Sequence, residues 1–320
     1  QAKHDIQHVE DIVIEMLRNA RDAGADKVYL ATTKEDGVRT LVFLDNGSGV
    51  PQDMQERIFD ARVTSKLESM KMDRWGVHGR GMALFSIKQN TDEARVVASD
   101  VDLGSVFKVS VATDRLGERA DQSSWPQAVK DEDGHYVCAR GPHNIIRAAC
   151  EFALEELRAC DVYLGSPSEI AATLHAQASS RLDASRLLFI DDEAELPVVD
   201  RLGLASDAED FIRICSGLGL EMSERTAHRI LAGQIKPVRG VTARLLRERD
   251  SSSHAPAPVD LAKDRRGLRI AKDDMAQFSR AVERDFNDLA ARYYLNLCGD
   301  PKIRVSRDRI TVTFDLAKEE

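Results

Sequence analysis

The sequence predicts an α+β fold in which a helical layer covers one face of a mixed β-sheet. Apolar residues recur at helical spacing over 8–23 and again over 82–89. Alternating runs predict strands at 27–33, 40–44, 94–99 and 105–112. A short helix at 52–59 and a loop at 60–80 are expected between these elements. This order departs from a βαβ repeat and favours helices packed on a sheet.

The composition is that of a globular protein that does not coat nucleic acid over its whole surface. Hydrophobic residues make up 42% of the 320 residues, and the formal net charge is −9, which leaves room for a local basic patch only. No apolar run approaches the roughly 18 residues that cross a bilayer. The polar start does not have the pattern of a signal peptide, and the five scattered cysteines form no C-x-x-C pair. We therefore expect a cytoplasmic protein with reduced thiols and no membrane partner.

Changes in composition divide the chain into five expected segments. The stretch SSSHAPAP, which begins at Ser251, is the clearest linker. The end of the chain reads as a long helix over 272–297 and a hairpin formed by 303–305 and 309–316. The expected segments are a domain at 1–115, a connector or inserted loop at 116–142, a helical region at 143–250, a linker at 251–259 and a C-terminal helix-plus-hairpin module at 260–320.

Three polar residues share one face of the first predicted helix. Glu15 and Asn19 are four residues apart, and Asp22 follows three residues later, so all three project from the same side. A carboxylate beside a carboxamide could orient a water molecule and complete the shell of a Mg²⁺ ion. Taken alone, the same pattern also suits a solvated helix face.

A glycine-containing loop follows the second predicted strand. In Asp45-Asn46-Gly47-Ser48-Gly49 the two glycines allow the backbone to approach a flat ligand closely. The Asp45 carboxylate can accept a hydrogen bond from an exocyclic amine such as that of adenine. An ordinary turn is the alternative, because Asp-Asn-Gly is also turn chemistry.

Glycines also precede the helix predicted at 82–89. Gly76, Gly79 and Gly81, with Arg80 between the last two, would present free N–H groups and a positive helix end to polyphosphate. No strand is predicted directly before this run and no Gly-Lys-Ser/Thr follows it, so it is neither the dinucleotide fingerprint nor a P-loop.

Taken in order, the three segments resemble the N, G1 and G2 boxes of the GHKL ATPase superfamily, which includes gyrase B, heat-shock chaperones, histidine kinases and MutL. The run from Asn19 to Ala25 resembles the N box of MutL, and 61–67 resembles the segment that opens its ATP lid. Ser105 stands where the family's last box, with Thr as its usual residue, begins a strand. The resemblance implies a Bergerat-type α/β sandwich over about the first 115 residues.

The resemblance further implies that this domain binds ATP together with Mg²⁺. Glu15 would be the general base that activates the attacking water, and Asn19 would bind the metal. Asp45 would accept from the adenine amine, with Gly49 beside the ring. The other implied nucleotide-binding residues are Asp22, Gly47, Thr64, Ser65, Lys66, Gly76, Gly79, Arg80, Gly81 and Ser105.

The resemblance supports ATP binding more strongly than hydrolysis. The family hydrolyses ATP slowly and uses it to close a lid or to form a homodimer, and positioning with electrostatics can suffice for phosphoryl transfer. In MutL-like relatives a second domain supplies a lysine to the γ-phosphate, and Lys236 is only a weak candidate here. Histidine kinase activity is not expected, because His8 lies on the same predicted helix as Glu15 and cannot swing into that site.

A second candidate function lies in the helical region. Residues 206–232 read as a helix, a glycine turn and a helix capped by Ser223, which resembles a helix-turn-helix. A structural helical hairpin with a solvated basic face is the alternative. A local basic strip that would contact DNA comprises Arg225, Arg229, Lys236, Arg239 and Arg244, continued by Arg247 and Arg249.

Two functions of different classes follow from the sequence. One is a slow Mg-dependent ATPase that uses lid closure to control engagement of a partner, with DNA as a candidate. The other is a regulatory or DNA-binding protein that senses ATP without hydrolysing it. The 260–320 module is a candidate dimerisation or partner-binding element to which the sequence assigns no chemistry.

Overall fold

The computed structural model describes most of the N-terminal part of the chain and short runs of the C-terminal part. The described residues are 6–61, 71–73, 76–78, 82–182, 190, 192–250 and short runs between 275 and 318. The chain divides into two compact units, Gln1–Ser252 and Ser253–Glu320. None of the helices in the described ranges has the length and apolar composition that a membrane span requires.

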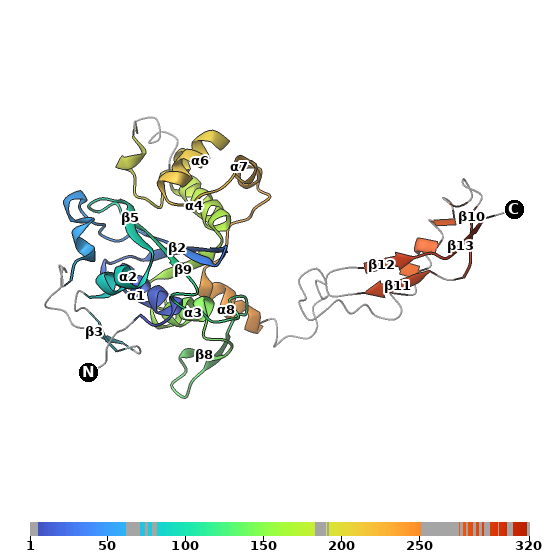
Figure 1. Cartoon of the computed structure of the whole chain (residues 1–320), viewed down its shortest axis with the longest axis horizontal. Coiled ribbons are helices and arrows are strands. Elements are labelled where there is room, and N and C mark those ends of the chain that lie inside the picture. Colours follow the sequence, from blue (N-terminus) through green and yellow to red (C-terminus); the bar gives the residue numbers. More distant parts are fainter. Residues whose placement is uncertain are drawn as a thin grey trace. The chain divides into compact units, whose positions relative to one another are not determined.

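The first unit is built on a five-stranded mixed sheet (Figure 1). In spatial order its strands are β5 (Glu93–Ser99), β6 (Ser105–Ala112), β2 (Val38–Asp45), β1 (Lys27–Glu35) and β9 (Asp161–Gly165). Neighbouring strands are antiparallel, except β1 and β9, which run parallel. The predicted α+β class is confirmed, and the alternating runs of the sequence form four of these five strands.

One face of the sheet carries the helix that opens the domain. This face is covered by α1 (Val9–Asp22), α2 (Ala83–Asn90), α3 (Ile145–Glu155) and α8 (Val241–Asp250). In α1 the apolar residues Val9, Ile12 and Leu17 are fully buried, and burial of such surface is the main stabilising contribution. The Asp11 carboxylate accepts hydrogen bonds from the backbone N–H groups of Gln7 and His8, which closes the start of the helix.

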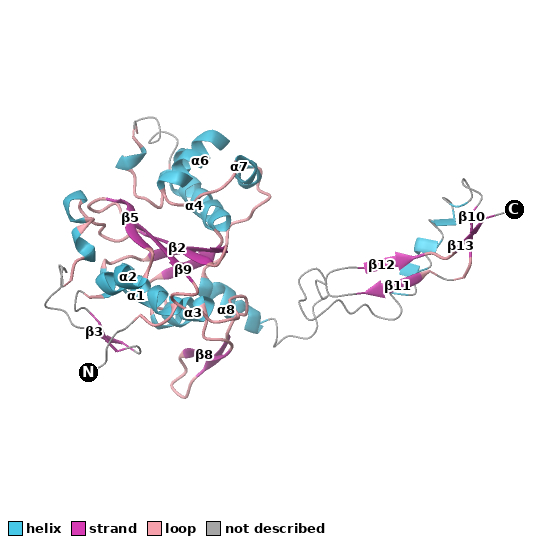
Figure 2. Ribbon diagram, viewed as in Figure 1, coloured by secondary structure: helices cyan, strands magenta, loops and turns pink. Residues whose placement is uncertain are grey.

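The opposite face of the sheet is also covered (Figure 2). Its cover consists of α4 (Pro167–Arg181), α6 (Ala208–Gly217), α7 (Glu224–Leu231) and the 3₁₀ turn η4 (Arg201–Leu204). Successive residues of β1 alternate between the faces, with Leu30 in the first core and Tyr29 in the second. The helices of the first 115 residues, α1 and α2, thus lie on one face as expected. The later helices cover the other face of the same sheet, because its strands are apolar on both sides.

Short strands and turns account for the other differences from the expected elements. The region expected to be mainly helical contains β9, and the expected connector contains the hairpin of β7 (Gln127–Lys130) and β8 (Tyr136–Arg140). The 3₁₀ turns η1 (Gln52–Met54) and η2 (Arg57–Phe59) replace the helix expected at 52–59. Within the expected loop, β3 (Lys71–Asp73) pairs with β4 (Gly76–His78). Segments of three to five residues are too short to show a clear period.

The described residues of the second unit form two pairs of strands. β11 (Lys302–Val305) pairs with β12 (Ile310–Thr313) as the expected hairpin, and β10 (Leu295–Leu297) pairs with β13 (Leu316–Lys318). The described residues between 275 and 290 are helical, whereas the end of the helix predicted over 272–297 is the strand β10. The predicted linker at 251–259 lies outside the described residues.

Candidate functional site

The loop that follows β2 lies against the C-terminal end of α1. The Ser48 N–H donates to the Ala23 carbonyl oxygen at 2.9 Å, and the Asn46 Oδ1 accepts from the Lys27 N–H at 2.9 Å. A Cβ added to Gly47 would lie 2.9 Å from the Ala23 Cβ, so only glycine allows this approach without a shift. These contacts hold the loop against the helix that carries three of the expected site residues.

Asp45, the last residue of β2, is almost fully buried. The residue is 3% exposed, and its Oδ1 accepts a hydrogen bond from the Gly47 N–H at 2.8 Å. Burial raises the pKa of Asp45 to about 7 against the opposing effect of the Gly47 hydrogen bond. A buried carboxyl that titrates near neutrality is typical of binding and catalytic sites. The structure thus makes Asp45 the most distinctive polar group of the loop.

The turn between β5 and β6 completes this region. The Ser99 hydroxyl donates to the Gly104 carbonyl oxygen at 2.8 Å and accepts from the Val50 N–H at 2.7 Å. Gly49 has a φ of +71°, and a Cβ there would lie only 1.8 Å from the Asp100 carbonyl oxygen. Close packing between the two loops therefore requires glycine at this position. From the sequence, Gly49 was expected to allow close approach of a ligand instead.

Glu15 lies on α1 in a buried ion pair. The residue is 7% exposed, and its Oε1 accepts from the Arg18 Nη1 at 2.7 Å. Arg18 is 0% exposed. Glu15 is therefore not part of a solvated helix face. Arg18 was missed by the motif comparison, although its i, i+3 spacing from Glu15 was visible in the sequence.

Asn19 and Asp22 follow on the next turn of α1. The Asn19 Nδ2 is buried and has no hydrogen-bond partner among the described residues. Rotation of the amide would put the carbonyl oxygen, a ligand suited to Mg²⁺, in that place. Asp22 accepts from the Arg21 Nε at 3.2 Å, and the Arg21 Nη1 lies 3.2 Å from the carboxylate of Glu156, the residue that caps the C-terminal end of α3. Asp22 thus belongs to an ion-pair chain that ties α1 to α3.

The lid and the glycine run fall largely outside the described part of the chain. Gly76 begins β4, and α2 begins at Ala83 with Met82 as its N-cap, so the helix expected after the glycine run is present. The expected site residues that lie outside the described residues are Thr64, Ser65, Lys66, Gly79, Arg80 and Gly81.

The predicted basic strip does not form one surface. The α7 helix buries Ala227 in the core of one sheet face, whereas α8 buries Leu245 in the core of the other. The Arg244 guanidinium of α8 lies 3.9 Å from the centre of the Trp125 ring. The expectation of a continuous strip from Arg225 to Arg244 was wrong, because the segment between the two helices passes from one face of the sheet to the other.

An open hollow of about 590 Å³ borders α7. The helix begins as expected, with the Ser223 Oγ accepting from the Thr226 N–H at 3.3 Å. Arg225 and Arg229 lie one turn apart and are exposed. The hollow is lined by Glu224, Arg225, His228, Arg229, Ala232 and Gln234.

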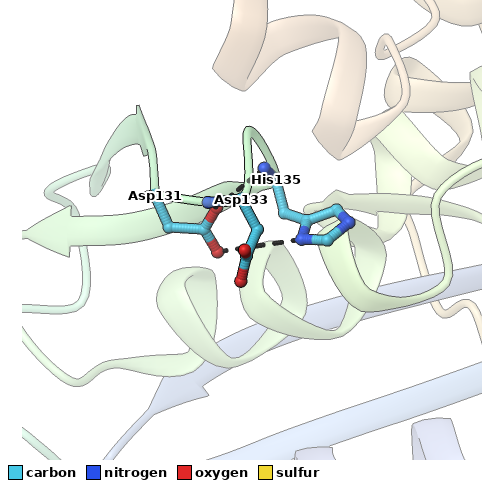
Figure 3. Close-up of side chains that lie close together, drawn as sticks. All are labelled: Asp131, Asp133 and His135. Atoms are coloured by element: carbon cyan, nitrogen blue, oxygen red, sulfur yellow. Dashed lines mark hydrogen bonds and ion pairs between the residues drawn. The ribbon is translucent and has the colours of Figure 1, made fainter.

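A cluster of metal-ligating residue types lies in the turn between β7 and β8 (Figure 3). Ligand atoms of Asp131, Asp133 and His135 lie within 4.8 Å of one another, and all three residues are exposed. The Asp131 Oδ1 accepts from the N–H groups of Asp133 at 3.1 Å and His135 at 2.8 Å. These hydrogen bonds explain the cluster as the closure of a hairpin turn, and we assign no metal to it.

Comparison with known proteins identifies the N-terminal segment. Residues 6–99 match the family described as histidine kinase-, DNA gyrase B-, and HSP90-like ATPase. The DNA mismatch repair protein MutL of Thermodesulfovibrio yellowstonii is 31% identical over 104 residues, which are 31% of this chain and 19% of that protein. MutL of Pediococcus pentosaceus is 29% identical over 121 residues, which are 37% of this chain and 18% of that protein. The chain thus spans about a fifth of the length of these relatives.

One solved structure shares a partial likeness with the chain. It is the catalytic domain of the histidine kinase ThkA, with 17% sequence identity and a TM-score of 0.25. The likeness covers 32% of this chain and 63% of the kinase domain.

Proposed function

Because residues 6–99 form an ATPase domain of the histidine kinase-, DNA gyrase B- and HSP90-like family, we propose that this domain binds ATP with Mg²⁺ between α1, the loop after β2 and the turn between β5 and β6. The buried Asp45 carboxyl carries the proposal, since the residue is 3% exposed and burial raises its pKa to about 7. The 6-amino group of adenine would donate to this carboxylate and stabilise its ionised form.

Asn19 is the residue that would hold the metal ion. Its buried Nδ2 has no hydrogen-bond partner among the described residues, and rotation of the amide would put there an oxygen, which belongs to the ligand set that Mg²⁺ prefers. When bound, the ion would offset the negative charge of the phosphates. The glycine run from Gly76 to Gly81 and the lid residues Thr64 to Lys66 would contact the phosphates in the same complex.

We further propose that Glu15 acts as the general base of slow hydrolysis. The attacking water would lose a proton to Glu15 while its oxygen bonds to the γ-phosphorus. The bond from that phosphorus to the bridging oxygen breaks, and ADP leaves with the electron pair. Closure of the lid around the nucleotide would then control a partner. An ATP-sensing protein without turnover is the alternative.

Substitution of Glu15 tests this function in the full chain. We expect Glu15→Ala to keep the ATP affinity of the parent and to lose turnover, measured by calorimetry and by phosphate release. Glu151→Ala is a matched control, because Glu151 is 8% exposed and accepts from Arg147 of the same helix at 2.9 Å. A parent that binds ATP without turnover would favour the sensor, and a parent without affinity for Mg-ATP would refute the proposal.

A second proposal concerns contact of the α7 hollow with the phosphates of DNA. Arg225 and Arg229 border this hollow, and guanidinium groups suit bidentate contacts to phosphate. The MutL relatives are named as DNA mismatch repair proteins. Arg244 lies on the other face of the sheet and is excluded from this surface, whereas Lys236 and Arg239, exposed after α7, could extend it.

A salt titration of duplex binding tests the second proposal. The double variant Arg225→Ala/Arg229→Ala should bind more weakly and lower the slope of log affinity against log salt by about two. Arg244→Ala, whose side chain stacks on Trp125, is the control and should keep the parental slope. Absence of duplex binding at low salt would remove DNA as a partner of α7.

A further inference from the structure

We propose that Arg18 is the positioning residue that holds Glu15 in the orientation required for proton transfer. The inference rests on the proposed ATPase function, because it assigns Glu15 the role of general base. It is carried by the 2.7 Å contact between the Arg18 Nη1 and the Glu15 Oε1, and by the complete burial of Arg18.

The placement of Arg18 is costly unless the guanidinium is paired. An isolated charge loses its hydration when it is buried, and a nearby opposite charge offsets this loss. Arg18 is 0% exposed and Glu15 is 7% exposed, so the ion pair between them offsets part of the cost of burying the two charges. The helix face that carries Glu15 continues to Asn19, whose Nδ2 has no hydrogen-bond partner among the described residues.

A buried ion pair seldom stabilises a fold more than a packed apolar pair would. Stability alone therefore does not explain why the Arg18–Glu15 pair lies in the proposed site. The pair formed by Arg147 and Glu151 shows what a structural role looks like in this chain. Arg147 also donates to the carbonyl oxygens of Gly141 at 3.1 Å and Cys138 at 2.9 Å, which ties α3 to the end of β8. The pair on α1 includes the proposed general base.

The contact explains how a buried carboxylate can serve as a base. The hydrogen bond from Arg18 engages Oε1 and restricts rotation of the carboxylate, so that the carboxylate is held in one orientation. Without Arg18, the carboxylate would lose this orientation, so that nucleotide binding would persist while hydrolysis would slow.

Three variants of the full chain test this role. Arg18→Met removes the charge, Arg18→Lys keeps the charge without the planar fork, and Arg147→Met removes the comparable pair on α3. We expect both methionine variants to lower the Tm. Only Arg18→Met should lower kcat for ATP, by roughly 10- to 100-fold, with the Kd for Mg-ATP within about threefold of the parent. Arg18→Lys should give an intermediate kcat.

Four outcomes would overturn the inference. Parental kcat in Arg18→Met would do so while the proposed ATPase function stands. An equal loss of kcat in Arg147→Met would show that any lost buried pair acts through packing alone. A parent that binds ATP without turnover would overturn this inference together with the proposed hydrolysis. If Arg18→Met does not fold, Arg18→Lys decides, and parental kcat in that variant would refute the role.

Discussion

Asp45 and Ser105 lie directly opposite each other on β2 and β6, each of them 3% exposed. The two residues come from motifs 60 positions apart in the sequence, and the antiparallel ladder brings them together. The Ser105 Oγ lies 3.2 Å from the Ser99 Oγ, so two hydroxyl groups lie at this end of the sheet. Burial is the main cause of the raised pKa of Asp45.

Asp45→Asn should weaken recognition of adenine. An asparagine that keeps the hydrogen bond from Gly47 would turn its NH₂ group toward the 6-amino group of adenine, so that two donors face each other. We expect the affinity for ATP to fall roughly 10- to 100-fold and that for inosine triphosphate, which has a 6-oxo group, to fall less. Calorimetry with both nucleotides measures this, with the exposed Asp53→Asn as control. An unchanged preference for ATP would contradict it.

Asp45 should also make the stability of the fold depend on pH. Its folded-state pKa of about 7 lies above the ordinary value of 3.8, so the folded protein holds the proton more tightly than the unfolded chain does. The contribution to stability is fully present below pH 3.8 and is lost as the pH rises to about 7. The difference is on the order of 4 kcal/mol.

Urea unfolding between pH 4.5 and 8 checks this dependence. The free energy of unfolding of Asp45→Asn should change less with pH across this window than that of the parent, because the variant has no titrating group at this position. Identical slopes for the two proteins would show that Asp45 does not titrate in this range.

Gly49→Ala should cost more stability than Gly37→Ala. Both glycines have positive φ, +71° and +78°, but a Cβ at Gly49 would meet the Asp100 carbonyl oxygen at 1.8 Å, whereas Gly37 has nothing within 4 Å. We expect Gly37→Ala to lose about 1–2 kcal/mol from backbone strain alone, and Gly49→Ala to lose more and to weaken ATP binding. Denaturant titrations provide the comparison, and equal losses would be evidence against the close approach of the two loops.

Asn19→Ala should separate metal binding from folding. The buried Nδ2 has no partner among the described residues, so its removal should change the free energy of unfolding by less than about 1 kcal/mol. The affinity for ATP should fall about tenfold with Mg²⁺ present and hardly at all in EDTA. Calorimetry under both conditions measures the difference. A similar loss in EDTA would assign Asn19 to the nucleotide rather than to the metal.

Ser99→Ala should loosen the end of the sheet near Asp45. The Ser99 hydroxyl accepts from the Val50 N–H and donates to the Gly104 carbonyl oxygen, and alanine would leave both buried groups unpaired. We expect a loss of about 2–3 kcal/mol in the free energy of unfolding. Ser110→Ala, on the same sheet with its hydroxyl 3.2 Å from that of Thr40, should cost less. A smaller effect at Ser99 than at Ser110 would contradict this ranking.

The sequence predicted the elements whose periodicity is long enough to detect. The α1 helix and the strands around Asp45 and Ser105 lie where their apolar patterns put them. The strand β9 was missed because Asp161–Gly165 is short and follows a helical run. Its pairing with β1 joins residues 134 positions apart, a relation that no local pattern contains.

The sequence suggested which residues belong to the candidate site but not what surrounds them. Glu15 and Asp45 were expected in their motifs, yet neither the burial of Arg18 nor the titration of Asp45 near neutrality can be deduced from spacing. The grouping of Arg225 with Arg244 failed for the same reason. Arg225 and Arg244 are close in sequence but lie on opposite faces of the sheet, because the chain passes from one face to the other between them.

Because helices cover both faces of the sheet, a shortened form of this protein has to keep both sets of helices. A fragment that ends at residue 115 would lack α4, α6 and α7, and it would expose Tyr29, Val42 and Leu44, which these helices bury. Such a fragment should aggregate, although it contains every segment of the ATPase motif. The segment up to residue 115 should therefore not be expressed or transferred alone. Expression, fusion or domain-exchange experiments should keep residues 6–250 together.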